Sequence, residues 1–233
     1  MPYSFDVDRF AQRPFVGILR GFATELALKA AEVVVKGGIA NLEVTLNTPG
    51  AGDQIRHVAT TLGQRVNIGA GTVRTVQDVH DALEAGATYI VTPMVDQRVI
   101  SACREAAVPV FVGAFTPTEI LQAWEYGATM IKIFPAHSQG PGYLRDLRGP
   151  LSDIPLMPTG GVTVENLSEF HRAGAQAFGI GSPLFDTARI ATHDWDWLKS
   201  RAQAFVQALA TSAADPAREA ATLAATLRER IPQ

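Results

Sequence analysis

A pattern that repeats eight times constrains the fold of this chain more than any other feature. Each repeat is a short apolar, β-branched run, a turn marked by Gly or Thr, and an amphipathic segment rich in Ala and Leu. Alternation of this kind is typical of parallel strands joined by crossover helices. The eight predicted strands are FVGIL (15–19), NLEVTL (41–46), VNIGA (66–70), TYIVT (88–92), VPVFV (108–112), TMIKIF (129–134), IPLMP (154–158) and AFGIG (177–181).

Eight such units fit a closed (β/α)8 barrel, the TIM barrel fold. An open, doubly wound sheet is the alternative, because the number of strands does not by itself force closure. We predict a single domain over residues 1–233, with a barrel core at about 14–210, an N-terminal helical segment and a C-terminal helical extension at 211–233. Residues 187–210 are predicted as the last helix of the core. After the break at AADP, residues 217–230 are predicted as one extra Ala-rich helix.

Composition and charge narrow the class of protein. The chain has 233 residues, of which 47% are hydrophobic and 18% charged, and its net charge of -3 argues against a nucleic acid or an anionic membrane as partner. No apolar run approaches the roughly 18 residues of a membrane span. The acidic start, MPYSFDVDRFAQRPF, argues against a secretory signal, and a single cysteine, Cys103, allows no internal disulfide. We therefore expect a cytoplasmic protein.

A lysine in the sixth predicted strand requires an explanation. In MIKIFPA (130–136), Ile131 and Ile133 share one face, and Met130, Lys132 and Phe134 share the other. Lys132 could lie at a strand end and reach water, but an unpaired buried ammonium is costly. Directed into a barrel near its C-terminal mouth, the lysine would lie where barrel active sites form. Desolvation would lower its pKa, and the free amine could attack a ketone to form a Schiff base.

A glutamate in the second predicted strand, Glu43 in NLEVTL, is equally unexpected in a buried parallel strand. A solvated edge carboxylate is the alternative. In a closed eight-stranded barrel the second and sixth strands lie opposite one another, and even-numbered strands share inward-facing layers. Closure would therefore set the Glu43 carboxylate across the mouth from the Lys132 amine, as a general acid and base for imine chemistry.

Two glycine-containing loops follow the seventh and eighth predicted strands, PTGGVTVENL (158–167) and IGSPLF (180–185). We expect each loop to lead into a helix, the first capped by Thr163 and the second starting at Pro183. Backbone N–H groups at such positions suit a phosphate, and barrels often bind phosphate after these two strands. The alternative is that the glycines only make tight turns. The candidate phosphate-binding residues are Gly160, Gly161, Gly181 and Ser182.

Other polar residues lie at predicted strand ends. Arg20 ends ILRG, Thr72 ends GAGT, and Thr92 and Pro93 end IVTP. An arginine beside a hydroxyl suits a substrate carboxylate, although Arg20 could instead form a surface ion pair.

No metal site is predicted, because the five histidines show no ligand spacing. Three of them, His57, His80 and His171, fall in predicted helices, where we expect them on the surface. Cys103 is expected to be a core residue.

The motifs LEVTLNTP, GAGTV, IVTP, KIFPA and PTGGVTVENL, in this order and spacing, resemble the 2-keto-3-deoxy-6-phosphogluconate (KDPG) and 6-phosphogalactonate (KDPGal) aldolases. The resemblance covers roughly residues 14–210. It implies a class I aldolase on a (β/α)8 barrel, a homotrimer that needs no metal or other cofactor. It also implies that Lys132 forms an imine with the C2 ketone and that Glu43 is the acid/base. The remaining implied site residues are Thr72, Pro93 and Phe134 around pyruvate, and Gly160, Gly161, Gly181 and Ser182 around the phosphate.

The residues that distinguish the gluconate branch of this family from the galactonate branch give conflicting indications in this sequence. Asn47 stands where the gluconate branch has an arginine, and Arg20 in ILRG resembles the galactonate branch. Thr159 in PTGG resembles the gluconate branch and could contact a hydroxyl near C4.

The expected reaction is cleavage of a 2-keto-3-deoxy-6-phosphosugar acid to pyruvate and glyceraldehyde 3-phosphate. The alternatives are a 4-hydroxy-2-oxoglutarate-type pyruvate aldolase, a phosphosugar isomerase or epimerase, and a non-catalytic sugar-phosphate binding protein.

Overall fold

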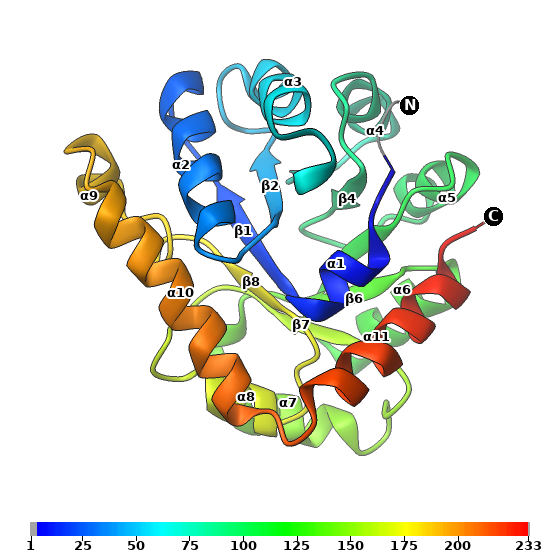
Figure 1. The fold of residues 1–233 in the computed structure, drawn as a ribbon. Coiled ribbons are helices and arrows are strands. Elements are labelled where there is room, and N and C mark those ends of the chain that lie inside the picture. The colour runs from blue at the N-terminus through cyan, green and yellow to red at the C-terminus, as the bar shows by residue number, and fades with distance from the viewer. Residues whose placement is uncertain (1–3, 233) are drawn as a thin grey trace.

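The computed structural model describes residues 4–232, so residues 1–3 and 233 of the predicted domain lie outside the described residues. Its eight strands form one parallel sheet in the order β7-β6-β5-β4-β3-β2-β1-β8 (Figure 1). The strands are β1 (Phe15–Leu19), β2 (Asn41–Thr45), β3 (Asn67–Gly71), β4 (Tyr89–Val91), β5 (Val110–Ala114), β6 (Met130–Ile133), β7 (Leu156–Pro158) and β8 (Phe178–Ile180).

Helices follow the strands and surround them (Figure 1). They are α1 (Val7–Gln12), α2 (Thr24–Lys36), α3 (Ala51–Leu62), α4 (Val76–Glu84), α5 (Gln97–Glu105), α6 (Pro117–Tyr126), α7 (Gly140–Arg148), α8 (Leu167–Arg172), α9 (Thr187–Ala191), α10 (Trp195–Ser212) and α11 (Pro216–Arg230), with 3-10 turns at Gly63–Arg65 and Ala136–Ser138. No helix within residues 4–232 is long and apolar enough to cross a membrane.

The sheet closes into a barrel. Each strand pairs in parallel with its sequence neighbour from β1 to β7, and β8 pairs with β1. A parallel bridge between Thr159 and Gly179 joins the ends of β7 and β8. The prediction of a (β/α)8 barrel is therefore confirmed, and the open-sheet alternative is wrong.

The alternation along each strand sorts its side chains between two apolar clusters. Leu42, Val44, Ile131 and Ile133 belong to the cluster between the sheet and the surrounding helices. Met130 belongs to the second cluster, inside the barrel. Because side chains alternate along a strand, the residues between the outward pairs on β2 and β6 must point into the barrel.

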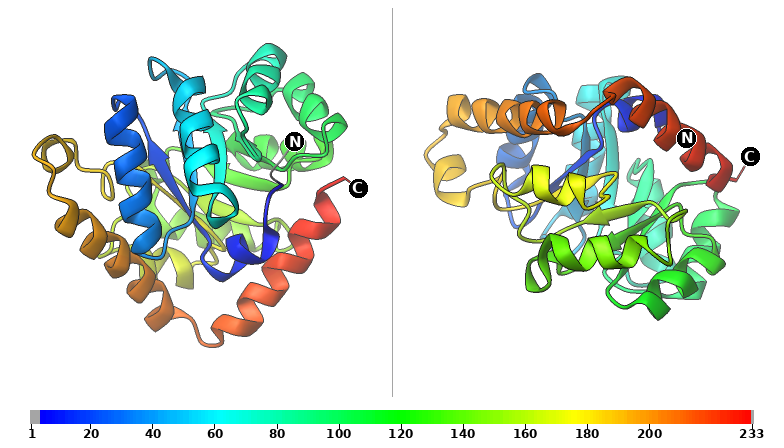
Figure 2. Two further views of the ribbon diagram at one scale, coloured as in Figure 1. Left: turned by 45° about the horizontal axis from the view of Figure 1, so that its top comes forward. Right: turned by 90° about the horizontal axis from the view of Figure 1, so that it is seen from below.

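Two helices close the N-terminal end of the barrel. Phe10 of α1 packs into the inner cluster together with Leu223 and Leu227 of α11. Arg228 of α11 forms a 2.6 Å ion pair with Asp8. Figure 2 shows α11 running beside α1 in both views. The extra C-terminal helix therefore covers the bottom of the barrel.

The tail and two turns differ from the prediction. Residues 187–210 are not one helix: α9 ends at Ala191, His193 adopts a positive φ of 58°, and Asp194 caps α10. The helices expected at Thr163 and Pro183 begin later, at Leu167 and Thr187. Hydrogen-bonded turns occupy 163–166 and 181–185 instead, and Thr163 and Asn166 accept each other's backbone N–H groups in the first of them. Asp186 caps α9 by accepting the Arg189 N–H, whereas Asn166, the N-cap of α8, makes no side-chain cap.

Candidate active site

Lys132 lies inside the barrel, in the third position of β6. The residue is 5% exposed, and it pairs in register with Gly113 of β5 and Met157 of β7. The Lys132 side-chain nitrogen, Nζ, lies 5.3 Å from the centre of the Phe134 ring. Phe134 itself is 38% exposed, so its ring contacts both the buried amine and the solvent at the open end of the barrel.

Glu43 lies inside the barrel on β2, with 1% of its side chain exposed. Neither carboxylate oxygen has a hydrogen-bond partner among the described residues. The space for this carboxylate comes from Gly71 at the end of β3: a Cβ at that position would lie 2.7 Å from Glu43 Cδ. A buried carboxylate without partners is costly in a fold and is typical of a group held for chemistry.

The electrostatics of the two groups are linked. Burial lowers the pKa of Lys132, and the charge of Arg20 lowers it further, while Glu43 opposes them. Burial raises the pKa of Glu43, opposed by the charges of Lys132 and Arg20. Both shifts favour the neutral forms, an uncharged amine and a protonated carboxyl. These are the forms that a nucleophile and a general acid require.

A tyrosine that was not among the predicted site residues lies below the glutamate. Tyr89 of β4 is fully buried, and its hydroxyl donates a 2.8 Å hydrogen bond to the carbonyl of Leu42, the residue before Glu43. Burial raises the pKa of Tyr89 well above its ordinary value, and the charge of Glu43 raises it further. Gly69 leaves room for the ring, since a Cβ there would meet it at 2.6 Å. The strand pattern could have identified this residue, because Tyr89 and Val91 alternate with the outward-facing Ile90 and so face the inside of the barrel.

Arg20 follows β1 and has an exposed side chain that forms no ion pair within the described part of the chain. The alternative of a surface ion pair therefore has no support here. The next residue, Gly21, donates its N–H to the Thr48 hydroxyl at 2.9 Å, and that hydroxyl lies 3.2 Å from the hydroxyl of Thr45. This chain of contacts fixes the loop that carries Arg20 onto the end of β2. Asn47, one residue before Thr48, is exposed.

The predicted pyruvate-pocket residues lie at neighbouring strand ends. Thr72 follows β3 and has φ +60°, a strained conformation for a non-glycine residue that is common at functional sites. Pro93 follows β4 and packs against Gly113, where a Cβ would lie 2.5 Å from the Pro93 carbonyl carbon. Because Gly113 of β5 pairs with Lys132 of β6, only β5 separates Pro93 from the strand that carries the amine. Thr92 fixes this turn by bonding the Met94 carbonyl and the Gly113 N–H.

The candidate phosphate loops lie after β7 and β8. Gly160 and Gly161 have φ values of +87° and +84°, which favour glycine. His137, which is exposed, packs over them: a Cβ at Gly161 would lie 3.3 Å from His137 Cα. Within the described residues, no backbone carbonyl accepts a bond from the N–H groups of the four candidates, Gly160, Gly161, Gly181 and Ser182.

Thr159 directly follows β7 and bridges to Gly179 of β8. It is 3% exposed, and its side chain packs on Gly179, where a Cβ would lie 2.9 Å from Thr159 Cγ2. Among residues 4–232, the Thr159 hydroxyl makes a single, long hydrogen bond of 3.4 Å to the Met157 carbonyl, so it retains capacity to bond a ligand.

The remaining predictions for titratable residues have mixed outcomes. Cys103 is buried, as expected, and burial raises its pKa to about 12. His57 and His80 are exposed on helices, but the prediction is wrong for His171, which packs between helices and bonds Ser212 and Glu219. Among residues 4–232, no three His, Cys, Asp or Glu side chains are grouped to hold a metal ion.

Comparisons with known proteins agree with this geometry. Residues 8–200 match the family model described as KDPG and KHG aldolase. The chain is 36% identical over 173 residues to 2-dehydro-3-deoxy-6-phosphogalactonate aldolase of Escherichia coli, covering 74% of this chain and 84% of that one.

Solved structures give the same result. A native KDPGal structure superposes with a TM-score of 0.81 at 34% identity, covering 85% of this chain and 95% of that one. KDPG aldolase from Legionella pneumophila, with pyruvate captured as a covalent carbinolamine, superposes with a TM-score of 0.80 at 28% identity, covering 86% and 98%.

Proposed function

The chain belongs to the KDPG and KHG aldolase family, and we propose that it cleaves a 2-keto-3-deoxy-6-phosphosugar acid to pyruvate and glyceraldehyde 3-phosphate. The observation that carries the proposal is a lysine amine buried in the barrel, opposite an unpartnered buried carboxylate. The carbinolamine captured in the Legionella enzyme supports covalent lysine chemistry for this family.

The proposed reaction begins with Lys132. Its neutral amine attacks the C2 ketone of the substrate, and the resulting carbinolamine loses water to give a protonated imine. Glu43, protonated because of its burial, supplies the proton that lets hydroxide leave as water. This step needs the lowered pKa of Lys132, because an ammonium ion is not a nucleophile.

Cleavage then uses the same two groups. The Glu43 carboxylate takes the proton of the C4 hydroxyl, the C3–C4 bond breaks, and its electron pair moves into the imine to form an enamine. The aldehyde product, glyceraldehyde 3-phosphate, leaves. Protonation of the enamine at C3 restores an imine, and water releases pyruvate and the free amine.

The surrounding residues bind the substrate in this proposal. Arg20, unpaired and with its charge acting on both catalytic groups, takes the carboxylate. Thr72, Pro93 and Phe134 enclose the three carbons that become pyruvate. Thr159 contacts the hydroxyl near C4. The phosphate is held by the backbone N–H groups of Gly160, Gly161, Gly181 and Ser182, with no metal or other cofactor.

Two further expectations remain proposals. We propose a homotrimer, which light scattering coupled to size-exclusion chromatography tests: a mass near three chains supports it and a monomer contradicts it. We also propose a cytoplasmic location, supported by the single cysteine.

The test is a coupled assay that measures pyruvate released from the two C4 epimers, the gluconate and galactonate substrates, and from 4-hydroxy-2-oxoglutarate. Cleavage of at least one phosphorylated substrate, lost in Lys132→Ala, supports the proposal. Cleavage of the unphosphorylated acid alone would identify a 4-hydroxy-2-oxoglutarate-type aldolase. No pyruvate from any of the three would leave phosphosugar isomerisation as the better explanation and would refute the proposal.

A further inference from the structure

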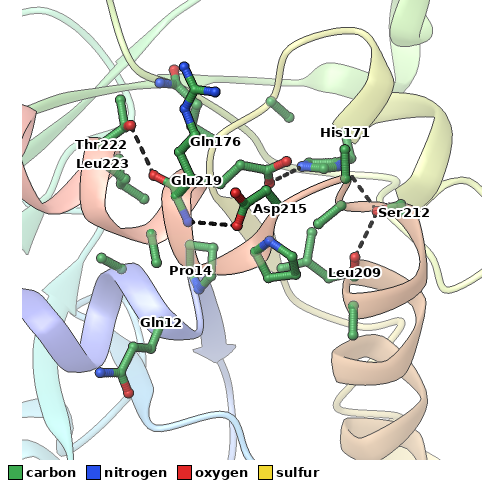
Figure 3. A pocket seen from close by; sticks show the side chains of 18 of the residues that line it. Gln12, Pro14, His171, Gln176, Leu209, Ser212, Asp215, Glu219, Thr222 and Leu223 are labelled. Atoms are coloured by element: carbon green, nitrogen blue, oxygen red, sulfur yellow. Dashed lines mark hydrogen bonds and ion pairs between the residues drawn. The ribbon is translucent and has the colours of Figure 1, made fainter.

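A cavity of about 970 Å³ lies at the end of the barrel opposite the catalytic mouth. Its walls come from the α1–β1 connection, the end of α8 with the turn that follows, the second half of α10 and the first half of α11. Figure 3 shows Gln12 and Pro14 on the side of α1, and Leu209, Ser212 and Glu219 on the side of the two C-terminal helices. The volume is at the upper end of the range of small-molecule sites, about 300–1,000 Å³.

The C-terminal extension creates this cavity. The family match ends at residue 200, inside α10, whereas one wall is formed by lining residues that lie between Val206 and Leu223. The cavity therefore lies between the bottom of the (β/α)8 core and the C-terminal helices, and neither Lys132 nor Glu43 is among its lining residues. It exists only because α11 turns back across the bottom of the barrel.

A row of hydrogen bonds holds the wall in place. The Ser212 hydroxyl lies 3.0 Å from His171 Nδ1, and His171 Nε2 lies 3.0 Å from Glu219 Oε2. These three side chains come from α8, α10 and α11 and meet at the cavity (Figure 3). Asp215 caps α11 through the N–H of Arg218. The acidic groups of the cavity are thus already engaged within the protein.

The cations of the cavity are not all engaged. Arg13, Arg172 and Arg218 line it and are exposed, and they form no ion pair within residues 4–232. Arg148, also in the lining, bonds three backbone carbonyls at the end of α7. With four arginines against two acids, the cavity is a positively charged site on a chain whose net charge is -3.

The other lining residues indicate which chemical groups a ligand would need beside its charged group. Phe15, Val206, Leu209 and Leu223 provide apolar walls. The side-chain oxygen of Gln176 is buried and has no hydrogen-bond partner among the described residues, so a ligand hydroxyl or N–H group could satisfy it.

From the unpaired arginines, the apolar walls and the volume, we propose that this cavity binds a small organic anion: a carboxylate or phosphate ester on an apolar body, with a hydrogen-bond donor for Gln176. The site is independent of the substrate pocket. Its occupant would bridge α8, α10 and α11 and stabilise the arrangement in which α11 closes the barrel.

The probe for the test is 8-anilinonaphthalene-1-sulfonate, an anionic aromatic fluorophore, titrated into the full chain with saturating pyruvate. We expect saturable, one-to-one fluorescence enhancement. Ala217→Trp, which fills the cavity from the first turn of α11, should abolish it. Ala221→Trp is the matched control, because Ala221 is exposed on the same helix but outside the lining, and it should bind as the unmodified chain does. Equal binding by both variants, or no enhancement at all, would overturn the proposal.

The role of charge is tested separately. The double variant Arg172→Gln and Arg218→Gln should weaken probe binding at least tenfold. The control, Arg74→Gln with Arg145→Gln, removes the same charge from exposed positions outside the cavity and should change nothing. Phenyl phosphate and phenylacetate distinguish the two head groups, and the one that displaces the probe more strongly identifies the preferred anion. Equal displacement by neutral benzyl alcohol would contradict a charged site.

Discussion

Gly71→Ala isolates the placement of the Glu43 carboxylate without changing any charged group. The new methyl group would lie 2.7 Å from Glu43 Cδ, whereas ordinary carbon contacts are about 3.5–4.0 Å. Glu43 must therefore retreat by about 1 Å. A misplacement of this size costs on the order of 100-fold in rate, and the overpacking itself costs about 1–3 kcal/mol of stability.

The assay is kcat/KM for pyruvate release, together with urea denaturation to follow the free energy of unfolding. We expect kcat/KM to fall about 100-fold while borohydride still traps pyruvate on Lys132, because the amine is untouched. Gly52→Ala is the control: a Cβ at this helical position has no neighbour within 4 Å, so activity should stay unchanged. Unchanged kcat/KM in Gly71→Ala would refute the assignment of Glu43 as the acid/base.

Three further predictions concern the site and the extra helix. Glu43→Gln should lower kcat by about 10²- to 10⁴-fold, the usual contribution of general acid–base catalysis, and a smaller loss in stopped-flow kinetics would contradict its role. Imine formation should rise with pH through a Lys132 pKa below that of an ordinary lysine. Arg20→Gln should move that rise to higher pH, because a cation that lowers the Lys132 pKa is removed; a shift to lower pH would be inconsistent with the site. Leu227 is fully buried under the barrel, so Leu227→Ala should lower the free energy of unfolding, measured by urea denaturation, by about 2–5 kcal/mol. Glu229 is exposed on the same helix, so Glu229→Ala should lower it by less than about 0.5 kcal/mol. Equal losses in the two variants would show that α11 is not anchored to the barrel.

The barrel could be predicted from the sequence because its signals are local and repeated. Glu43 and Lys132 stand between outward-facing apolar pairs, so strand periodicity alone assigned both to the inner face. Their approach across the mouth required closure, which the bridge between Thr159 and Gly179 completes. Pairing between the first and last units is a long-range property that no local window contains.

The starts of the last helices were less predictable. The glycines after β7 and β8 mark the turns correctly, but α8 and α9 begin several residues later. Thr163 and Asn166 accept each other's backbone N–H groups in the turn before α8, and Asp186 accepts the Arg189 N–H at the start of α9. Side-chain bonds of this kind compete with helical backbone bonds, and the outcome depends on packing.

Contacts between distant elements were not predictable at all. His171 has the spacing of a surface histidine on α8, yet α10 and α11 fold back onto it. Gly71 and Tyr89 belong to ordinary strand sequences, and their connection to Glu43 exists only because β2, β3 and β4 lie side by side.

Mass spectrometry of the protein after incubation with pyruvate and borohydride tests most directly whether Lys132 forms an imine with the substrate ketone. If Lys132 is the nucleophile, one reduced pyruvyl adduct should form on the peptide that contains it, and none in Lys132→Ala with the same unfolding midpoint. A folded protein without an adduct in excess pyruvate, or an adduct that persists in Lys132→Ala, would show that the buried lysine of β6 does not form the imine.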